Sequence, residues 1–533
     1  MGVTLTGADW IIGLFVLSTT IALGLYLSMR SQSGGNSENF FLAGRRMIWP
    51  IVGGSLFATN IGAEHLVGMS GDCYRYGLRA GTIEVCALCL GVAAAFLFPY
   101  YLRNKIFTIP QFLELRYGHK ARLFFAGFTL FISIMMKLAL CLFAGALVLQ
   151  SLLGLDVMTT VFIMGIIAAV ITIIGGLAAV AYTDSLQTCL MILGCTIMLF
   201  IGLDKVGGWN QLVEKAGQAM SIHGPHDDPD FPFWGIVAAS FYAGIFYWGL
   251  DQTNVQRVLS AKNLHHARWG VMLAIFLKLF AIFIFAVPGV IAFVLYPGLE
   301  EPKLTFVTLL NQLLPSGLRG LVLAALVAAI ISSLDSVLNS ISTITVRDFG
   351  LNFWPDMSEK MQVLWGRVSI FVCTGLGIGA AYLVYRTPGG VYRYFQTLGA
   401  ITFMAVTPAI LFGIMSRKVT TKGAMISVII GCVTSSIFLA DEWMGPELGQ
   451  RIFPWLHTTL TTAYSYRGGW GFLFITLVLF VASAFTKKDP PEKLEGTTVD
   501  WKKKIESFEG LRDWRLHFAI LTILTIAIYA WLW

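Results

Sequence analysis

The chain has 533 residues, of which 56% are hydrophobic and only 13% are charged. This composition excludes an ordinary water-soluble enzyme and indicates a protein that folds largely in lipid. The formal net charge is +7, and the basic residues gather in alternate loops, about 25 on the side assigned to the cytoplasm against about 10 on the other. The charge therefore reflects membrane topology and does not indicate nucleic-acid binding.

Apolar stretches of about 20 residues, the length that crosses a bilayer, recur from residues 10–27 to residues 518–533. We count about fourteen, which predicts an all-α membrane protein with a single transporter domain over residues 1–533. No Lys or Arg precedes the first stretch, unlike a secretory signal peptide, so we expect a retained span with the N-terminus outside. An even number of spans returns the C-terminus to the same side. The expected location is the inner (plasma) membrane of the cell.

The second span is interrupted by small and polar residues. Residues 53–65 read Gly-Gly-Ser-Leu-Phe-Ala-Thr-Asn-Ile-Gly-Ala-Glu-His, and five spans later residues 243–252 read Ala-Gly-Ile-Phe-Tyr-Trp-Gly-Leu-Asp-Gln. Broken helices at equivalent positions predict an inverted repeat of five plus five helices around a site at the midplane, with core repeats at about 47–205 and 233–416. Alternatively, Gly and Ala only allow close helix packing, but packing alone does not require Asn60, Glu64 and His65.

Two loops are longer than the others. The polar segment 204–232 carries several acids and is expected to be a solvated external loop; its two histidines are weak evidence for a metal site. The segment 487–515 is expected to be a cytoplasmic linker that ends in a short interfacial helix with a basic face.

Charged residues occur inside the predicted spans, namely Glu84, Lys137, Asp184, Lys278 and Asp335. Each costs about 3 kcal/mol or more at mid-bilayer, so each should face a partner, water or a ligand. Glu84 and Lys278 can offset each other's burial and keep hydrogen-bonding capacity for a neutral ligand. The alternative is a purely structural pair, which would leave substrate affinity nearly unchanged when apolar isosteres replace both partners.

Hydroxyl groups crowd the segment 328–336, which reads Ala-Ala-Ile-Ile-Ser-Ser-Leu-Asp-Ser. Ser332 and Ser333, with carbonyl groups freed at the break near Ala58 and Ile61, offer uncharged oxygen ligands to a hard cation. None of these ligands titrates near neutrality, so the site favours sodium over a proton. Alternatively, the serines bond back to their own helix.

Several motifs in order carry a family resemblance. They are Asn-Phe-Phe-Leu-Ala-Gly-Arg at 39–45, Ala-Thr-Asn-Ile-Gly-Ala-Glu-His at 58–65, Phe-Thr-Ile-Pro-Gln-Phe at 107–112, Tyr-Thr-Asp-Ser-Leu-Gln-Thr at 182–188, Tyr-Trp-Gly-Leu-Asp-Gln at 247–252, Val-Gln-Arg at 255–257 and the serine run from 332 to 340. In these motifs, from about residue 40 to about residue 424, the chain resembles the sodium/glucose cotransporter family, within the sodium:solute symporters of the LeuT-type fold.

The resemblance implies a symporter, not an enzyme, that couples sodium entry to import of a sugar or related neutral polyol by alternating access. It implies a sodium site formed by the carbonyl groups of Ala58, Ile61 and Ala329 and the hydroxyl groups of Ser332 and Ser333. The implied substrate-binding residues are Asn60, His65, Glu84, Tyr247, Trp248, Lys278 and Gln396. Met69 and Tyr392 fall at outer-gate positions and Tyr247 at the inner gate, and Asp335 with Asp184 and Ser333 would complete a second sodium site.

Some alternatives remain open. Gly244 and Ile83 depart from residues near the sugar in the family, which leaves the substrate's identity undecided. The same fold could carry an inositol, an acidic sugar, an amino acid or a vitamin. A membrane sensor that kept a transporter fold is a different class, but we expect no signalling domain after the last span. A membrane enzyme using Glu64, His65 and Glu84 is another, but no activated nucleophile or metal trio accompanies these residues. The expected partners are the substrate and the lipid bilayer, with no nucleic acid and no obligate protein partner.

Overall fold

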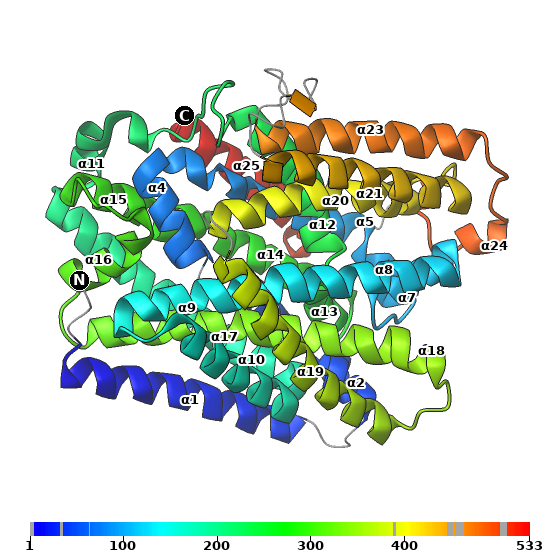
Figure 1. Cartoon of the computed structure of the whole chain (residues 1–533), viewed down its shortest axis with the longest axis horizontal. Coiled ribbons are helices and arrows are strands. Elements are labelled where there is room, and N and C mark those ends of the chain that lie inside the picture. Colours follow the sequence, from blue (N-terminus) through cyan, green and yellow to red (C-terminus); the bar gives the residue numbers. More distant parts are fainter. Residues whose placement is uncertain are drawn as a thin grey trace.

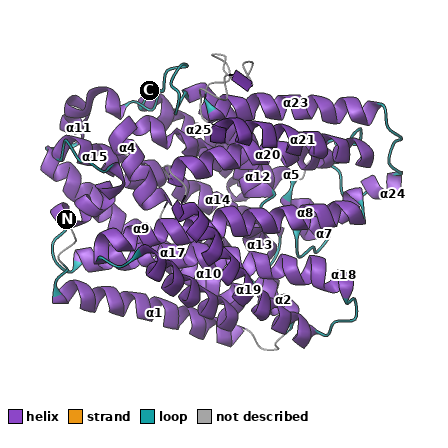
Figure 2. Cartoon of the chain, in the orientation of Figure 1, coloured by secondary structure: helices purple, strands orange, loops and turns teal. Residues whose placement is uncertain are grey.

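The computed structural model describes residues 5–31, 36–62, 64–386, 391–444, 451–452, 463–501 and 509–533. These residues form helices and loops without a β-strand (Figure 2), apart from an isolated bridge between Met47 and Ala261. Ten of the described helices are long and apolar enough to cross a membrane, or eleven when a bent pair is included. The prediction of an all-α membrane protein is confirmed.

Several long helices, such as α1, α8, α17 and α23, run along the long axis of the bundle, whereas α10 and α19 cross it obliquely (Figure 1). In the first half of the chain they are α1 (Gly7–Ser31), α2 (Ser37–Leu42), η1 (Ala43–Arg45), α3 (Trp49–Asn60), η2 (Glu64–Met69), α4 (Ser70–Tyr76), η3 (Leu78–Ala87), α5 (Leu88–Phe96), α6 (Phe98–Arg103), α7 (Ile109–Tyr117), α8 (His119–Ile132), η4 (Ser133–Leu138), α9 (Ala139–Leu153), α10 (Val157–Val206), α11 (Trp209–Ala216) and η5 (Gly217–Met220). In the second half they are α12 (Phe233–Gly249), α13 (Gln252–Leu259), α14 (Leu264–Ala281), η6 (Ile282–Ala286), α15 (Val287–Leu295), η7 (Pro302–Leu304), α16 (Thr305–Leu313), α17 (Leu318–Ile344), η8 (Thr345–Gly350), α18 (Leu351–Phe353), α19 (Glu359–Arg386), α20 (Val391–Met415), α21 (Thr421–Met444), α23 (Tyr464–Ala484), α24 (Pro491–Leu494), η10 (Gly510–Arg512) and α25 (Trp514–Trp531).

The 50-residue α10 is two crossings rather than one. Gly176 has φ 55° and ψ −162°, outside the helical region, and a Cβ there would lie 2.8 Å from the Phe40 carbonyl oxygen, so this break suits glycine. Dividing α10 there and counting the bent pair α12 and α13 gives twelve spans among the described residues. The interrupted α3 to α4, and α20 with its shorter apolar part Ile401–Met415, would bring the number to fourteen. This number agrees with the sequence prediction.

Both predicted helix interruptions are confirmed. Helix α3 ends at Asn60, Ile61 is extended (φ −94°, ψ 98°), and the chain resumes as the π-helix η2. Helices α12 and α13 meet at an angle of 51° across residues 250–251. The glycine pair before the first break serves close packing instead, because a Cβ at Gly53 would lie 2.6 Å from the Gly270 carbonyl oxygen. The break itself starts only after Asn60.

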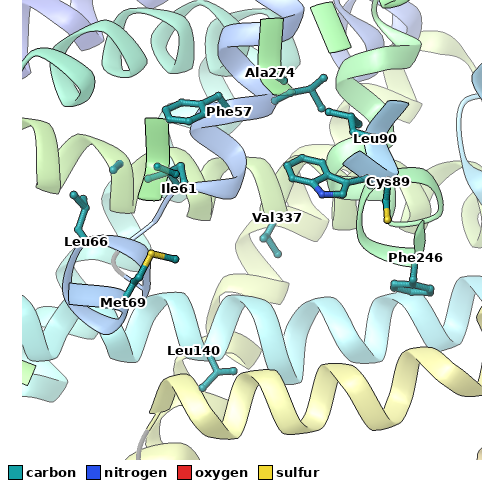
Figure 3. Packing of buried hydrophobic residues seen from close by; sticks show 14 of the residues in the cluster. Phe57, Ile61, Leu66, Met69, Cys89, Leu90, Leu140, Phe246, Ala274 and Val337 are labelled. Carbon is teal, nitrogen blue, oxygen red and sulfur yellow. The ribbon is translucent and has the colours of Figure 1, made fainter. Parts of the chain in front are cut away.

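Helix α17 runs across the bundle between α1 and the pair α8 and α9 (Figure 1), and it packs against α10, α1, α19 and α3. In its most apolar 18-residue window 89% of the residues are buried. Apolar side chains from both sides of the breaks enclose this region, including Phe57, Ile61, Met69, Phe246 and Val337 (Figure 3). The polar groups described below are therefore shielded from lipid.

Helix α17 receives its N-terminal cap from another helix. The Asp9 carboxylate of α1 accepts from the backbone N–H groups of Gly317 (2.7 Å) and Gly320 (3.1 Å), whereas Gly317 itself provides no side-chain cap. We expect Asp9→Ala to lower the free energy of unfolding by about 1–2 kcal/mol, the usual value of a lost cap. Thermal unfolding of the purified protein measures this change. Ile11→Ala, at a position that is 72% exposed, is the control, and equal unfolding temperatures for the two variants would contradict the capping role.

The first of the two long loops differs from expectation, and the second is only partly described. The segment 204–232 is not simply solvated: it forms α11 and η5, and the Ile222 N–H donates to the Leu532 carbonyl at the C-terminus (2.8 Å). In the linker, Val499 N–H donates to the Ile414 carbonyl (2.8 Å), which holds the segment against α20. The expected interfacial helix falls mostly on residues 502–508, outside the described residues.

Candidate sodium and substrate sites

A chain of buried polar side chains crosses the first helix break. Lys278 of α14 forms an ion pair with Glu84 of η3 and donates to Asn60 Oδ1 (2.5 Å). On the other side of the carboxylate, His65 Nε2 lies 3.4 Å from Glu84 Oε1. Asn60 Nδ2 donates to the Tyr247 hydroxyl (3.1 Å). The expected pairing of Glu84 with Lys278 is confirmed.

The arrangement brings five of the seven predicted substrate residues together from five elements. The ends of the two broken helices supply Asn60 and Tyr247, while η2, η3 and α14 supply His65, Glu84 and Lys278. One carboxylate balances one ammonium, and an amide, an imidazole and a phenol add further donors and acceptors. Such a set can exchange hydrogen bonds with a neutral hydroxylated molecule without leaving a net charge buried.

Trp248 is fully buried beside this row of polar side chains. Its ring lies 5.0 Å from that of Tyr247 in an edge-to-face arrangement. Gly244, one helical turn earlier, faces η3 and α5, because a Cβ there would lie 3.0 Å from Cys89 Sγ and 3.1 Å from Cys86 Cβ. A larger side chain at this position would press on Cys86 and Cys89, so the neighbouring segment would have to give by a few tenths of an ångström.

The predicted gate residues are only partly described. Met69 is fully buried at the end of η2, among the apolar residues that follow the first break (Figure 3). Tyr392 and Gln396 fall in the first turns of α20, and their side chains lie outside the described residues. The predicted roles of these residues stay predictions.

A second buried ion pair, which the sequence did not predict, supports the other break. Lys137 of η4 pairs with Asp251, and its Nζ lies 5.6 Å from the centroid of the Tyr247 ring. Asn254 Nδ2 donates to Asp251 Oδ2 (3.2 Å) and to the Tyr247 carbonyl oxygen (2.9 Å). In the sequence, the only indication of this pair is Asp251 inside the motif at 247–252. The sequence does not show which basic residue pairs with it.

The candidate sodium ligands lie on two facing segments. The extended backbone at Ile61 ends the helical ladder of α3, so the last carbonyl groups of that helix, including that of Ala58, have no partner within it. Opposite them, Ser333 Oγ donates to the Ala329 carbonyl oxygen (3.1 Å), as the back-bonding alternative expects. Thr59 Oγ1 lies 3.2 Å from Ser336 Oγ and joins the two segments. The oxygens of this set are of the kind that sodium accepts.

Ser332 has a different partner. Its hydroxyl donates to Asp184 Oδ1 (2.5 Å), so its hydrogen points at the carboxylate and its lone pairs are left for another group. The same carboxylate accepts from Ser55 Oγ (2.6 Å) and lies 3.8 Å from Arg257 Nη2. The other candidate for a second sodium site, Asp335, accepts from Thr172 Oγ1 (3.1 Å).

Three of these partners were not predicted from the sequence. Ser55 and Arg257 stand inside the quoted motifs but had no assigned role, and Thr172 carried no signal at all. Arg257 is buried together with its α13 neighbours. Among the described residues, no group of three or more His, Cys, Asp or Glu side chains is arranged to hold a metal ion.

Comparisons with known proteins identify the family of this chain. The pattern of the sodium:solute symporter family matches residues 40–431. The sodium/glucose cotransporter 1 of Mus musculus is 31% identical over 516 residues, covering 87% of this chain and 75% of the relative. The sodium/myo-inositol cotransporter of Homo sapiens is 30% identical over 533 residues, covering 90% and 73%.

Solved structures show the same fold. A Na⁺-coupled sialic acid symporter in a substrate-bound outward-open state superposes with a TM-score of 0.75 at 19% identity, covering 91% of this chain and 99% of the other. The family pattern spans most of the chain and both helix breaks. This chain belongs to the sodium:solute symporter family.

Proposed function

We propose that this symporter couples sodium entry to the import of a sugar or another neutral polyol. The observation that carries the proposal is the buried, charge-balanced polar chain of Lys278, Glu84, His65, Asn60 and Tyr247. An acidic solute would need an uncompensated cation in the site, whereas Lys278 is already paired. The sugar and inositol cotransporters among the relatives agree with a polyol.

We assign the remaining contacts by position. Trp248 and Gln396 would complete the substrate site, Met69 and Tyr392 the outer gate, and Tyr247 the inner gate. Sodium would be held by the carbonyl groups of Ala58, Ile61 and Ala329 and the hydroxyl groups of Ser332 and Ser333, with a second ion near Asp184, Ser333 and Asp335. The repeats would run over about 47–205 and 233–416.

One sodium ion suffices for concentrative uptake. A positive charge moving down about 100 mV releases about 2.3 kcal/mol, roughly a fiftyfold solute ratio. Sodium between the first break and α17 would stabilise the state in which both breaks present their polar groups to the substrate. The outer gate then closes and the inner gate opens, which releases sodium and the substrate to the cytoplasm. The coupling arises because the two states bind sodium and substrate with different affinities.

The proposed topology places both termini outside the plasma membrane. Figure 1 supports a shared side, because the start of α1 and the end of α25 lie at the same end of the bundle. An even number of crossings and the excess of basic residues in the loops assigned to the cytoplasm agree with this orientation.

A thermal-shift screen of the purified protein tests the proposed function. Monosaccharides, polyols and amino acids are added with sodium or with choline as its replacement. A ligand at 100 times its Kd stabilises the folded state by about 2.7 kcal/mol, so we expect a polyol to raise the unfolding temperature only with sodium. Two results would overturn the proposal: stabilisation by amino acids but by no polyol, or stabilisation by a polyol to the same extent in choline as in sodium.

The sodium site makes its own prediction. Ser333→Ala removes one proposed oxygen ligand, and we expect the half-saturating sodium concentration to rise roughly tenfold, since a hydrogen bond or ligand contact to a charged group contributes about 1.5 kcal/mol or more. Sodium-dependent uptake into proteoliposomes measures this value. Ser340→Ala, which removes another buried hydroxyl seven residues further along α17, is the matched control and should leave the sodium requirement unchanged.

A further inference from the structure

The segment that carries Glu84 is held in an unusual conformation. Residues Leu78–Ala87 form ten consecutive residues of 3₁₀-helix, although 3₁₀ runs longer than three or four residues are uncommon because their hydrogen bonds are poorly aligned. Glu84 nevertheless has to meet Lys278 on one side and His65 on the other. Contacts from outside the segment must therefore fix its position.

The last helix of the chain supplies such contacts. The Tyr529 hydroxyl of α25 donates to the Thr82 carbonyl oxygen (3.0 Å), two residues before Glu84. The Thr82 hydroxyl lies within hydrogen-bond distance of the Ile222 carbonyl oxygen (3.1 Å) and of the Arg79 carbonyl oxygen in its own segment (2.8 Å). The Ile222 N–H donates to the Leu532 carbonyl oxygen (2.8 Å). These bonds form a closed loop through η3, the segment after η5 and the C-terminus. Tyr529 and Thr82 are both buried.

Aromatic rings anchor the end of α25 in the same place. Trp531 stacks on Trp209 of α11 with 5.0 Å between ring centroids. Trp533 lies 4.2 Å from the His223 ring and 4.7 Å from that of Phe233, the first residue of α12. The C-terminal residues thus contact both η3 and the start of the broken helix that carries Tyr247.

The rest of α25 covers little of the protein. In the most apolar 18 residues of α25, only 17% of the residues are buried. However, Phe518 packs closely on Gly91 of α5, because a Cβ added at Gly91 would lie 2.0 Å from the Phe518 ring. Helix α5 continues directly from η3. A peripheral helix therefore contacts the Glu84-bearing span at two levels.

We propose that Tyr529 is a positioning residue for substrate binding, which acts by fixing the Thr82 carbonyl and with it the Glu84 carboxylate. The inference rests on the proposed function and deepens it, since it assigns part of the substrate affinity to a helix outside the repeats. When the Tyr529 bond is lost, η3 can shift against Lys278 and His65, and a carboxylate displaced by a fraction of an ångström no longer satisfies both partners and the substrate. Helix α25 packs mainly on α14, whereas the proposed sodium ligands lie on α3 and α17, so the sodium affinity should be unaffected.

Tyr529→Phe tests the proposal because it removes one hydroxyl and keeps the ring. We expect the substrate Kd in saturating sodium to rise about fivefold, the effect of one neutral hydrogen bond, with the sodium concentration for half-maximal stabilisation in the absence of substrate unchanged. The matched control is Thr525→Val, one turn earlier on α25, which removes a buried hydroxyl that bonds only the Leu521 carbonyl oxygen of its own helix (2.8 Å).

The outcomes separate the two proposals. The polyol identified by the thermal-shift screen is the probe, and a wild-type protein that binds no polyol in sodium overturns the proposed function itself. If the wild type binds but Tyr529→Phe matches Thr525→Val, the positioning role is wrong. A parallel loss of sodium and substrate affinity in Tyr529→Phe would also contradict it, since that pattern reports general destabilisation.

Discussion

Replacing Lys278 with methionine should lower the free energy of unfolding by about 3–5 kcal/mol and remove detectable substrate binding. The variant leaves the Glu84 carboxylate buried, with His65 as its remaining ionisable neighbour, and it also removes a donor to Asn60. Breaking a buried pair is more costly than deleting it, because one charge stays behind without compensation. Thermal unfolding and equilibrium binding of the labelled polyol measure the two effects.

The double variant Glu84→Met with Lys278→Met separates structure from function. It leaves no buried charge, so most of the lost stability should return. Binding should not return, because the groups that exchange hydrogen bonds with the substrate are gone. A double variant that binds the polyol with wild-type affinity would show that the pair is purely structural and that the substrate binds elsewhere.

The sequence predicted the Glu84 and Lys278 pair for a simple physical reason. Charges are so costly in the bilayer that each one needs a partner, and few charges lie inside the spans. The same reasoning identified Lys137 but not its partner, since several buried acids were available and sequence carries no distances. The second break turns the chain at residues 250–251, and this turn places Asp251 next to Lys137.

Long-range contacts of ordinary residues were beyond prediction. The loop 204–232 looked solvated because of its acids, yet its Trp209 and His223, together with Phe233 at the start of α12, pack on the C-terminal tryptophans. These contacts join segments about 300 residues apart, and no periodicity or motif signals them. In contrast, the two breaks were predictable, since a cluster of small and polar residues inside an apolar span is typical of backbone that lines a cavity at membrane depth.

Asp184→Asn should have the second large effect, on stability and on sodium together. The carboxylate joins Ser55 of α3, Ser332 of α17 and Arg257 of α13. Without its charge the buried guanidinium loses the carboxylate that lies 3.8 Å away, which should lower the free energy of unfolding by about 3 kcal/mol. The half-saturating sodium concentration should rise at least tenfold, because Ser332 loses the strong acceptor that orients its hydroxyl.

Two serine variants distinguish the stability effect from the sodium effect. Ser55 and Ser332 donate to the same carboxylate at nearly equal distances, 2.6 and 2.5 Å, but only Ser332 is a proposed ligand. Each Ser→Ala change should therefore alter the unfolding temperature by a similar small amount, measured in the same assay. Only Ser332→Ala should raise the sodium requirement for uptake, since its oxygen would face the ion while its hydrogen faces Asp184. Equal sodium requirements in the two variants would mean that Asp184 serves the fold alone, and that the ion binds elsewhere.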